Sequence, residues 1–129
     1  MLQTLLSKLA AELDIENEIQ KPESEHYTVP LAGTQIDMFQ HSDNFLFKTN
    51  IETLPHSNLE TLLRKTMEAN LYGWGSRDTI AGLNANGTIL TLTLALGNEI
   101  NYRDFFEKLE DFISLADFWR SEIQLLKKG

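Results

Sequence analysis

Every second residue from Leu90 to Leu96 is a leucine, and threonine or alanine fills the positions between them. Residues two apart share a face only in an extended strand, so this run predicts a β-strand with one buried face. It follows Asn86-Gly87, the preferred sequence of a tight hairpin turn. We therefore expect an antiparallel hairpin of strands 79–85 and 88–96, with the second strand at or near the centre of a sheet.

Three further strand-like runs precede this hairpin. Residues 27–31, 35–40 and 44–51 carry alternating apolar side chains, and turn-forming residues separate them. This pattern predicts a three-stranded antiparallel meander. Pro30 has no amide hydrogen to donate, so we place the first of these strands at an edge of the sheet.

Helical periodicity marks three other segments. Leucines at helical spacing predict a helix over residues 2–14, and a second stripe continues to Gly73 from a start at Ser57, the expected N-cap. A third helix is expected from about Asn101, whose side chain can cap it. The acidic segment 14–25 between the first helix and the first strand is interpreted as a solvated connector. The fold class is therefore α+β, with the order helix, three strands, helix, two strands, helix, and with the helices packed on one twisted antiparallel sheet.

Composition limits the size of the protein and its partners. The 129 residues suit a single domain spanning 1–129, and a net charge of −8 opposes binding to nucleic acid or to an anionic membrane. Cysteine is absent, so no disulfide or thiolate site can form. The first residues lack a basic region, and no stretch approaches the roughly 20 apolar residues that span a bilayer. We expect a cytoplasmic protein.

Catalytic patterns are weak throughout the chain. The three histidines, His26, His41 and His56, are evenly separated and lack the i, i+4 pairing of a zinc-binding helix, so no metal site is predicted. The segment 73–77 is glycine-rich, but it lies between a helix and a strand, the reverse of a phosphate-binding loop. We expect no enzymatic activity and no cofactor. A small-molecule pocket or a minor hydrolase site using His26, His41 or Trp74 stays open as an alternative.

Several segments together resemble a known family. They are Ala69-Asn70-Leu71-Tyr72-Gly73-Trp74-Gly75, the hairpin 82–87, the leucine-rich strand and the segment 116–122 of the last helix. With the element order, they resemble the class I type III secretion chaperones, the Tir-chaperone (CesT-like) family, most strongly over residues 57–123. The resemblance implies a homodimer that holds the N-terminal segment of a secreted effector in extended form, without enzymatic activity or cofactor.

The resemblance also implies two sets of site residues. Dimerisation in the family uses the second helix and the neighbouring strand, which here correspond to Leu59, Leu62, Leu63, Met67, Ile80 and Leu83. Effector binding uses apolar patches on the first helix and the early strands, which correspond to Leu2, Leu5, Leu6, Leu9, Val29, Leu31, Ile36, Met38 and Phe47. For both sets the alternative is that the residues belong to the protein's own core.

Two other roles remain open on the same fold. The protein can be a regulatory or heterodimerising relative of the chaperones whose partner is a component of the secretion apparatus. A small-molecule-binding domain is the alternative from a different class, and it requires a pocket into which polar groups converge.

Overall fold

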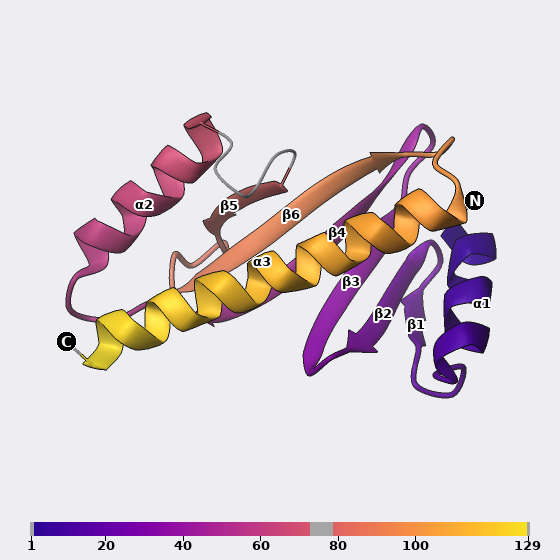
Figure 1. Cartoon of the computed structure of the whole chain (residues 1–129), viewed down its shortest axis with the longest axis horizontal. Coiled ribbons are helices and arrows are strands. Elements are labelled where there is room, and N and C mark those ends of the chain that lie inside the picture. Colours follow the sequence, from indigo (N-terminus) through magenta and orange to yellow (C-terminus); the bar gives the residue numbers. More distant parts are fainter. Residues whose placement is uncertain (1, 73–78, 129) are drawn as a thin grey trace.

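A computed structural model describes residues 2–72 and 79–128, which form one antiparallel sheet and three helices (Figure 1). The elements are α1 (Leu2–Leu13), β1 (Gln20–Glu23), β2 (His26–Leu31), β3 (Thr34–Gln40), β4 (Asn44–Thr53), α2 (Leu59–Tyr72), β5 (Thr79–Leu83), β6 (Ile89–Gly97) and α3 (Tyr102–Lys128). The strand order across the sheet is β1-β2-β3-β4-β6-β5. The α+β class, the helix positions and the inner place of β6 are confirmed.

One strand was not predicted. β1 lies in the acidic segment that the sequence presents as a connector, and all four of its residues are exposed. It pairs with β2 only at Gln20 opposite Thr28 and at Glu23 opposite His26. Because it buries no side chain, β1 has no apolar alternation for sequence reasoning to detect. The prediction that β2 is an edge strand is therefore wrong for residues 26–28, which pair with β1. It holds at Pro30, which does not pair with β1.

The hairpin of β5 and β6 exists, but its turn differs from the expected one. A two-residue type I′ turn needs positive φ at both central residues, whereas only Gly87, at +68°, has it here. The Asn84 amide N–H instead bonds the Ile89 carbonyl at 3.0 Å, which leaves a longer loop between them. The Asn84 side chain stabilises this loop by accepting bonds from Thr88 N–H at 2.8 Å and Ile89 N–H at 3.1 Å.

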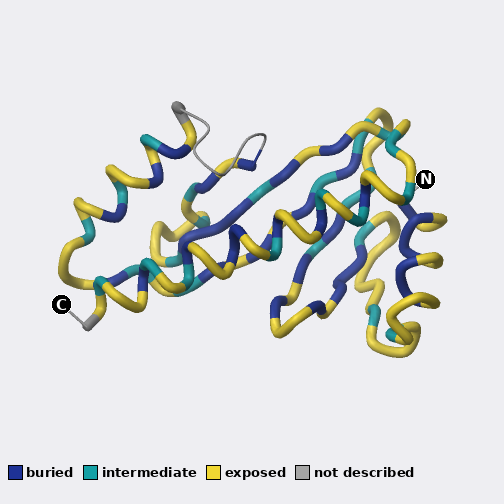
Figure 2. Tube along the Cα trace, in the orientation of Figure 1, coloured by how far each residue is buried: buried dark blue, intermediate teal, exposed yellow. Residues whose placement is uncertain are grey.

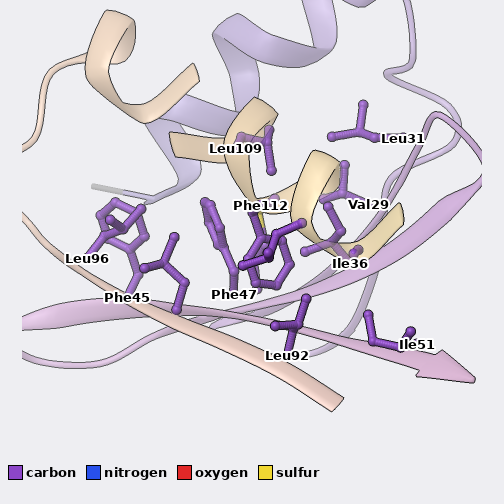
Figure 3. Packing of buried hydrophobic residues seen from close by; sticks show 14 of the residues in the cluster. Val29, Leu31, Ile36, Phe45, Phe47, Ile51, Leu92, Leu96, Leu109 and Phe112 are labelled. Atoms are coloured by element: carbon purple, nitrogen blue, oxygen red, sulfur yellow. The ribbon is translucent and has the colours of Figure 1, made fainter. Parts of the chain in front are cut away.

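The core lies between one face of the sheet and α3. Phe45 and Phe47 of β4 are fully buried and meet Phe105 and Phe112 of α3, with ring centroids 5.6–5.9 Å apart. Figure 3 shows Phe45, Phe47 and Phe112 in this cluster. Figure 2 shows buried residues along β6 and along the side of α3 that faces the sheet. As predicted, Asn101 caps α3, since its side-chain oxygen accepts a bond from Asp104 N–H at 2.8 Å.

The two shorter helices lie at opposite ends of α3. α1 lies beside its N-terminal end, and α2 lies beyond β5 near its C-terminal end (Figure 1). α2 begins at Leu59, and the Asn58 carbonyl accepts its first helical bond, from Leu62 N–H at 3.2 Å. Asn58 therefore holds the N-cap position that was predicted for Ser57. Within residues 2–72 and 79–128 no helix is long and apolar enough to cross a membrane.

Candidate interaction surfaces

α2 has two apolar stripes with different surroundings. Leu62 is fully buried, and Thr66 and Ala69 continue its stripe into the core. Leu59 and Leu63 are half-buried, and Met67, one turn further on, has 70% of its surface exposed. The stripe formed by Leu59, Leu63 and Met67, here called the α2 outer stripe, faces away from the protomer. Among the residues predicted for the dimer interface, only Leu62 is fully enclosed by its own chain.

The two predicted interface residues of β5 are exposed on opposite faces of the strand. Ile80 is 61% exposed and Leu83 is 44% exposed. Leu83 shares a strand face with the buried Thr79 and Ala81, whereas Ile80 points to the other side. The structure therefore brings large apolar side chains to the outside of α2 and to both faces of β5, but it does not merge them into one flat patch.

The nine side chains predicted for effector binding are all buried in one cluster. None of them exposes more than 9% of its surface: Leu2, Leu5, Leu6 and Leu9 on α1, Val29 and Leu31 on β2, Ile36 and Met38 on β3, and Phe47 on β4. The leucines of α1 lie in the same buried cluster as the strand residues, and α3 covers Phe47. The structure thus favours the core interpretation of these residues, and their contact with a client stays a prediction.

Polar contacts fasten both ends of α1. The Gln40 side-chain oxygen accepts a bond from Leu2 N–H at 2.9 Å, and its nitrogen donates to Asn98 Oδ1 at 2.9 Å. At the other end the Tyr102 hydroxyl donates to Glu12 Oε2 at 2.6 Å. Burial and the adjacent Glu12 carboxylate raise the pKa of Tyr102 to about 12. These contacts join residues far apart in the sequence, so no local sequence pattern predicts them.

The outer face of the sheet carries an apolar row that sequence reasoning missed. His26, Phe39, Leu46 and Ala95 lie opposite one another across β2, β3, β4 and β6. The first three are half-buried and Ala95 is exposed. The His26 ring stacks on Phe39 with 4.3 Å between centroids. The signal was available, because Phe39 and Leu46 occupy positions between the inward-facing residues of their strands.

Next to this outer row, Asp37 organises a small polar group. His26 Nε2 lies 3.2 Å from Asp37 Oδ1, and the Thr28 hydroxyl donates to the same oxygen at 3.0 Å. The imidazole is thereby held flat against Phe39. His26 is thus positioned by Asp37 on one side and by the Phe39 ring on the other.

A shallow cavity of about 350 Å³ lies between the end of β4 and the start of α2, beside the C-terminal part of α3. Its lining residues are Thr53, Leu54, Pro55, His56, Ser57 and Lys127. Lys127 is 3.6 Å from Glu52 and so is already paired. His26 and His41 do not line this cavity, and Trp74 lies outside the described residues. Among the side chains that the structure places, no three His, Cys, Asp or Glu residues group around a possible metal position.

The sequence matches a known protein family over most of its length. The family model of the Tir chaperone protein (CesT) family matches residues 4–120. The chain belongs to this family. A protein of Chlamydia pneumoniae is 24% identical over 131 residues, covering 99% of this chain and all of its own length. The family is one of type III secretion chaperones, in agreement with the resemblance noted in the sequence.

Solved structures show the same fold. A chain of the HopA1–SchA chaperone–effector complex matches with a TM-score of 0.69 at 11% identity, covering 93% of each chain. A chain of the ExsC–ExsE complex matches with a TM-score of 0.70 at 13% identity, covering 95% of this chain and 92% of that one. The heterodimeric ExoU–SpcU complex of the Pseudomonas aeruginosa type III secretion system gives 0.65 at 15% identity, with coverages of 89% and 95%.

Proposed function

We propose that this protein is a cytoplasmic, single-domain chaperone of a type III secretion system. It binds the N-terminal segment of one or more effectors in extended form and keeps them soluble and competent for secretion. The match to the Tir chaperone family over residues 4–120 carries this proposal. Apolar side chains exposed at several surfaces support it, because large exposed apolar groups mark places where another protein binds.

The outer row of His26, Phe39, Leu46 and Ala95 is the surface on which we place the first client contact. It is accessible without any rearrangement, whereas the nine buried residues predicted from the sequence become accessible only if a helix leaves the sheet, which for Phe47 means α3. An extended segment can add main-chain bonds at the exposed β1 edge, where Pro22 and Pro30 limit their number. Affinity then comes from a few apolar anchors in the row.

Self-association is the second part of the proposal. A second copy covers the α2 outer stripe together with Ile80 and Leu83 of β5, which places five of the six predicted interface residues at the contact. Met67 and Ile80 support this arrangement, since each leaves well over half of its surface in water. Leu62 stabilises the protomer beneath the contact instead of taking part in it.

The negative charge sets the salt dependence of client binding. With a net charge of −8, the protein attracts basic client segments, and dissolved salt screens this attraction and shortens its range. We therefore expect association rates to fall as ionic strength rises. Rates that do not change with salt would argue for clients recognised by apolar contacts alone.

Light scattering after size-exclusion chromatography, followed by a pull-down with identification of the retained protein, tests the proposal. We expect a dimer of twice 14.7 kDa that retains a secreted protein, and loss of retention when the N-terminal segment of that protein is deleted. Leu46→Lys should abolish retention. Asn50→Lys, which adds the same charge at an exposed position of the same strand, should not. A monomer that retains nothing would overturn the proposal.

A regulatory role is the second candidate, since one structural neighbour is itself a heterodimeric complex. In that case the partner is a component of the secretion apparatus or its control. The same pull-down separates the two candidates: an effector retained through its N-terminal segment supports the first, and a structural or regulatory protein supports the second.

A further inference from the structure

The two edges of the sheet differ in how accessible their backbone is. The sheet ends at β1 on one side and at β5 on the other. On the β5 side the side chain of Asn70, from α2, binds the backbone of Ala81 twice. Its nitrogen donates to the Ala81 carbonyl at 2.8 Å, and its oxygen accepts from Ala81 N–H at 3.0 Å. Both polar groups of the central residue of β5 are thus occupied by a side chain.

These two bonds copy those of a neighbouring strand. A carboxamide carries one carbonyl and one N–H group in a plane, as a peptide does. In an antiparallel ladder, alternate residues direct both backbone groups to the same side. Because Ala81 turns its groups away from β6, the outward positions of β5 are Thr79, Ala81 and Leu83. Asn70 occupies the middle one, so a strand that adds to this edge must break both bonds.

The position of this contact matters because exposed apolar residues surround it. Met67 lies one turn before Asn70 on α2, and Ile80 and Leu83 flank Ala81 on β5. An unpaired strand edge with apolar side chains on both faces is a template for uncontrolled pairing with another chain. A polar side chain that satisfies the edge removes this template and leaves the apolar side chains available.

We infer that Asn70 is a positioning residue that closes the β5 edge to strand addition, so that a second copy meets this end of the molecule through side chains and not through a continuous sheet. The first half of this inference stands on the Asn70–Ala81 geometry alone. The second half rests on the proposed homodimer. Partner choice at this end is therefore set by one carboxamide as well as by the apolar residues around it.

Three variants test the inference. Asn70→Ala removes both bonds and opens the edge, and Asn70→Lys removes the same bonds but places a charge there, which blocks strand pairing. Asn84→Ala is the matched control. It makes the same change in the adjacent loop, where the side chain bonds to Thr88 and Ile89 and does not contact the outer edge of β5. Circular dichroism and thermal unfolding first establish that each variant folds.

Hydrogen exchange and light scattering give the readouts. In Asn70→Ala we expect the Ala81 amide to exchange about tenfold faster, the effect of losing one typical hydrogen bond. We also expect species larger than those of the wild type, which grow with protein concentration. Asn70→Lys should show the faster exchange without the larger species, and Asn84→Ala should show neither.

Two results would overturn the inference. If Asn70→Ala and Asn84→Ala give the same mass distribution, or if Asn70→Lys associates as Asn70→Ala does, the carboxamide has only a structural role. A monomeric wild type is a separate outcome. It removes the proposed homodimer, while the comparison of Asn70→Ala with Asn84→Ala still decides whether the edge is guarded.

Discussion

α1 and α2 are both amphipathic helices with leucine stripes, yet their apolar faces have different surroundings. On α1 all the stripe leucines from Leu2 to Leu9 are buried, whereas of Leu59, Leu62, Leu63 and Met67 on α2 only Leu62 is buried, and Met67 is 70% exposed. An apolar stripe thus establishes that a helix has a face to bury, but not which chain buries it. The covering surface decides, and that surface is built from strands elsewhere in the sequence.

The width of the sheet beneath each helix explains the difference. The leucines of α1 are buried in the same cluster as Val29, Ile36 and Met38 of β2 and β3, and α1 also contacts α3. α2 contacts mainly β5, a five-residue edge strand whose inner positions include the small Ala81. A five-residue edge strand is too short and narrow to cover two stripes of a helix, so the α2 outer stripe stays exposed. The apolar face of α1 is therefore enclosed by its own chain, whereas α2 keeps an exposed apolar stripe.

Truncating one residue on each helix gives the largest expected difference. Leu9→Ala should lower the free energy of unfolding by about 2–5 kcal/mol, because Leu9 is fully buried and its loss leaves a cavity. Met67→Ala should change protomer stability by less than about 0.5 kcal/mol. Urea unfolding followed by far-UV circular dichroism, over a range of protein concentrations, separates protomer unfolding from dissociation. Equal losses would show that the two helices are equally enclosed.

Charge on the α2 outer stripe should act on association and spare the protomer. Met67→Lys is expected to raise the dissociation constant of the proposed dimer at least about tenfold, since it places a charge in the proposed contact with the second copy. Leu13→Lys, at an exposed apolar position at the far end of α1, is the matched control and should leave the constant unchanged. Sedimentation equilibrium measures both. A Met67→Lys dimer as tight as the wild type would move the interface elsewhere.

Sequence periodicity predicted most of the fold because each of those elements buries one face. The alternation of Leu90 to Leu96 and the helical spacing of the α1 leucines both arise because one face of each element is buried, and both elements lie where they were expected. β1 has no such alternation, because all four of its residues are exposed; it is held to β2 by backbone pairing and by Lys21, whose Nζ lies over the Tyr27 ring. The turn at Asn86-Gly87 differed because the Asn84 side chain bonds to backbone groups and stabilises a longer loop.

The interaction surfaces were harder to predict than the fold. The six dimer residues and nine effector residues are all apolar, but the structure encloses ten of them within the protomer and leaves the rest half-buried or exposed. Whether such a face is covered depends on contacts between distant segments, such as α1 with β2 and β3. The outer row was missed for a related reason. Phe39 and Leu46 point away from the core, and the buried residues of β3 and β4 already account for the apolar alternation of these strands.

The polar anchor of α1 is expected to have a moderate effect. Tyr102→Phe removes the bond to Glu12 and should lower the free energy of unfolding by about 1 kcal/mol, the value of a typical hydrogen bond. Amide exchange in the last turn of α1 should accelerate, while exchange in α2 should not. Unchanged exchange in α1 would show that its leucines alone hold it in place.

The same contact predicts a dependence on alkaline pH. The pKa of Tyr102 is raised from 10.0 to about 12 in the folded protein, so its stabilising contribution is complete below pH 10 and is lost as the pH rises to about 12. The stability difference between the wild type and Tyr102→Phe should therefore shrink over this range. Ultraviolet absorbance of the phenolate, taken as a difference between the two proteins, measures the pKa itself. A value near 10 would contradict the burial of this hydroxyl beside Glu12.

The smallest expected effect concerns the end of α3 that lies near α2. Glu52 accepts a bond from Thr53 N–H at 3.0 Å and pairs with Lys127, and Gln124 Nε2 donates to it at 2.9 Å. The backbone bond first, and then the charge of Lys127, lower the pKa of Glu52 below its ordinary value of 4.5. Glu52→Gln should therefore lower the free energy of unfolding at pH 7 by less than about 1 kcal/mol.

The loss of stability in Glu52→Gln should depend on pH in one direction. Because the folded pKa of Glu52 is depressed, its contribution is present above pH 4.5 and disappears as the pH falls through the folded value. Glu107→Gln breaks an exposed pair with Arg103 on the same helix and serves as the control, with no loss expected. Urea unfolding from pH 3 to 7 compares the two variants. A Glu52→Gln deficit that does not shrink at all as the pH falls from 4.5 to 3 would assign the effect to packing at the end of α3 and not to the charge of Glu52.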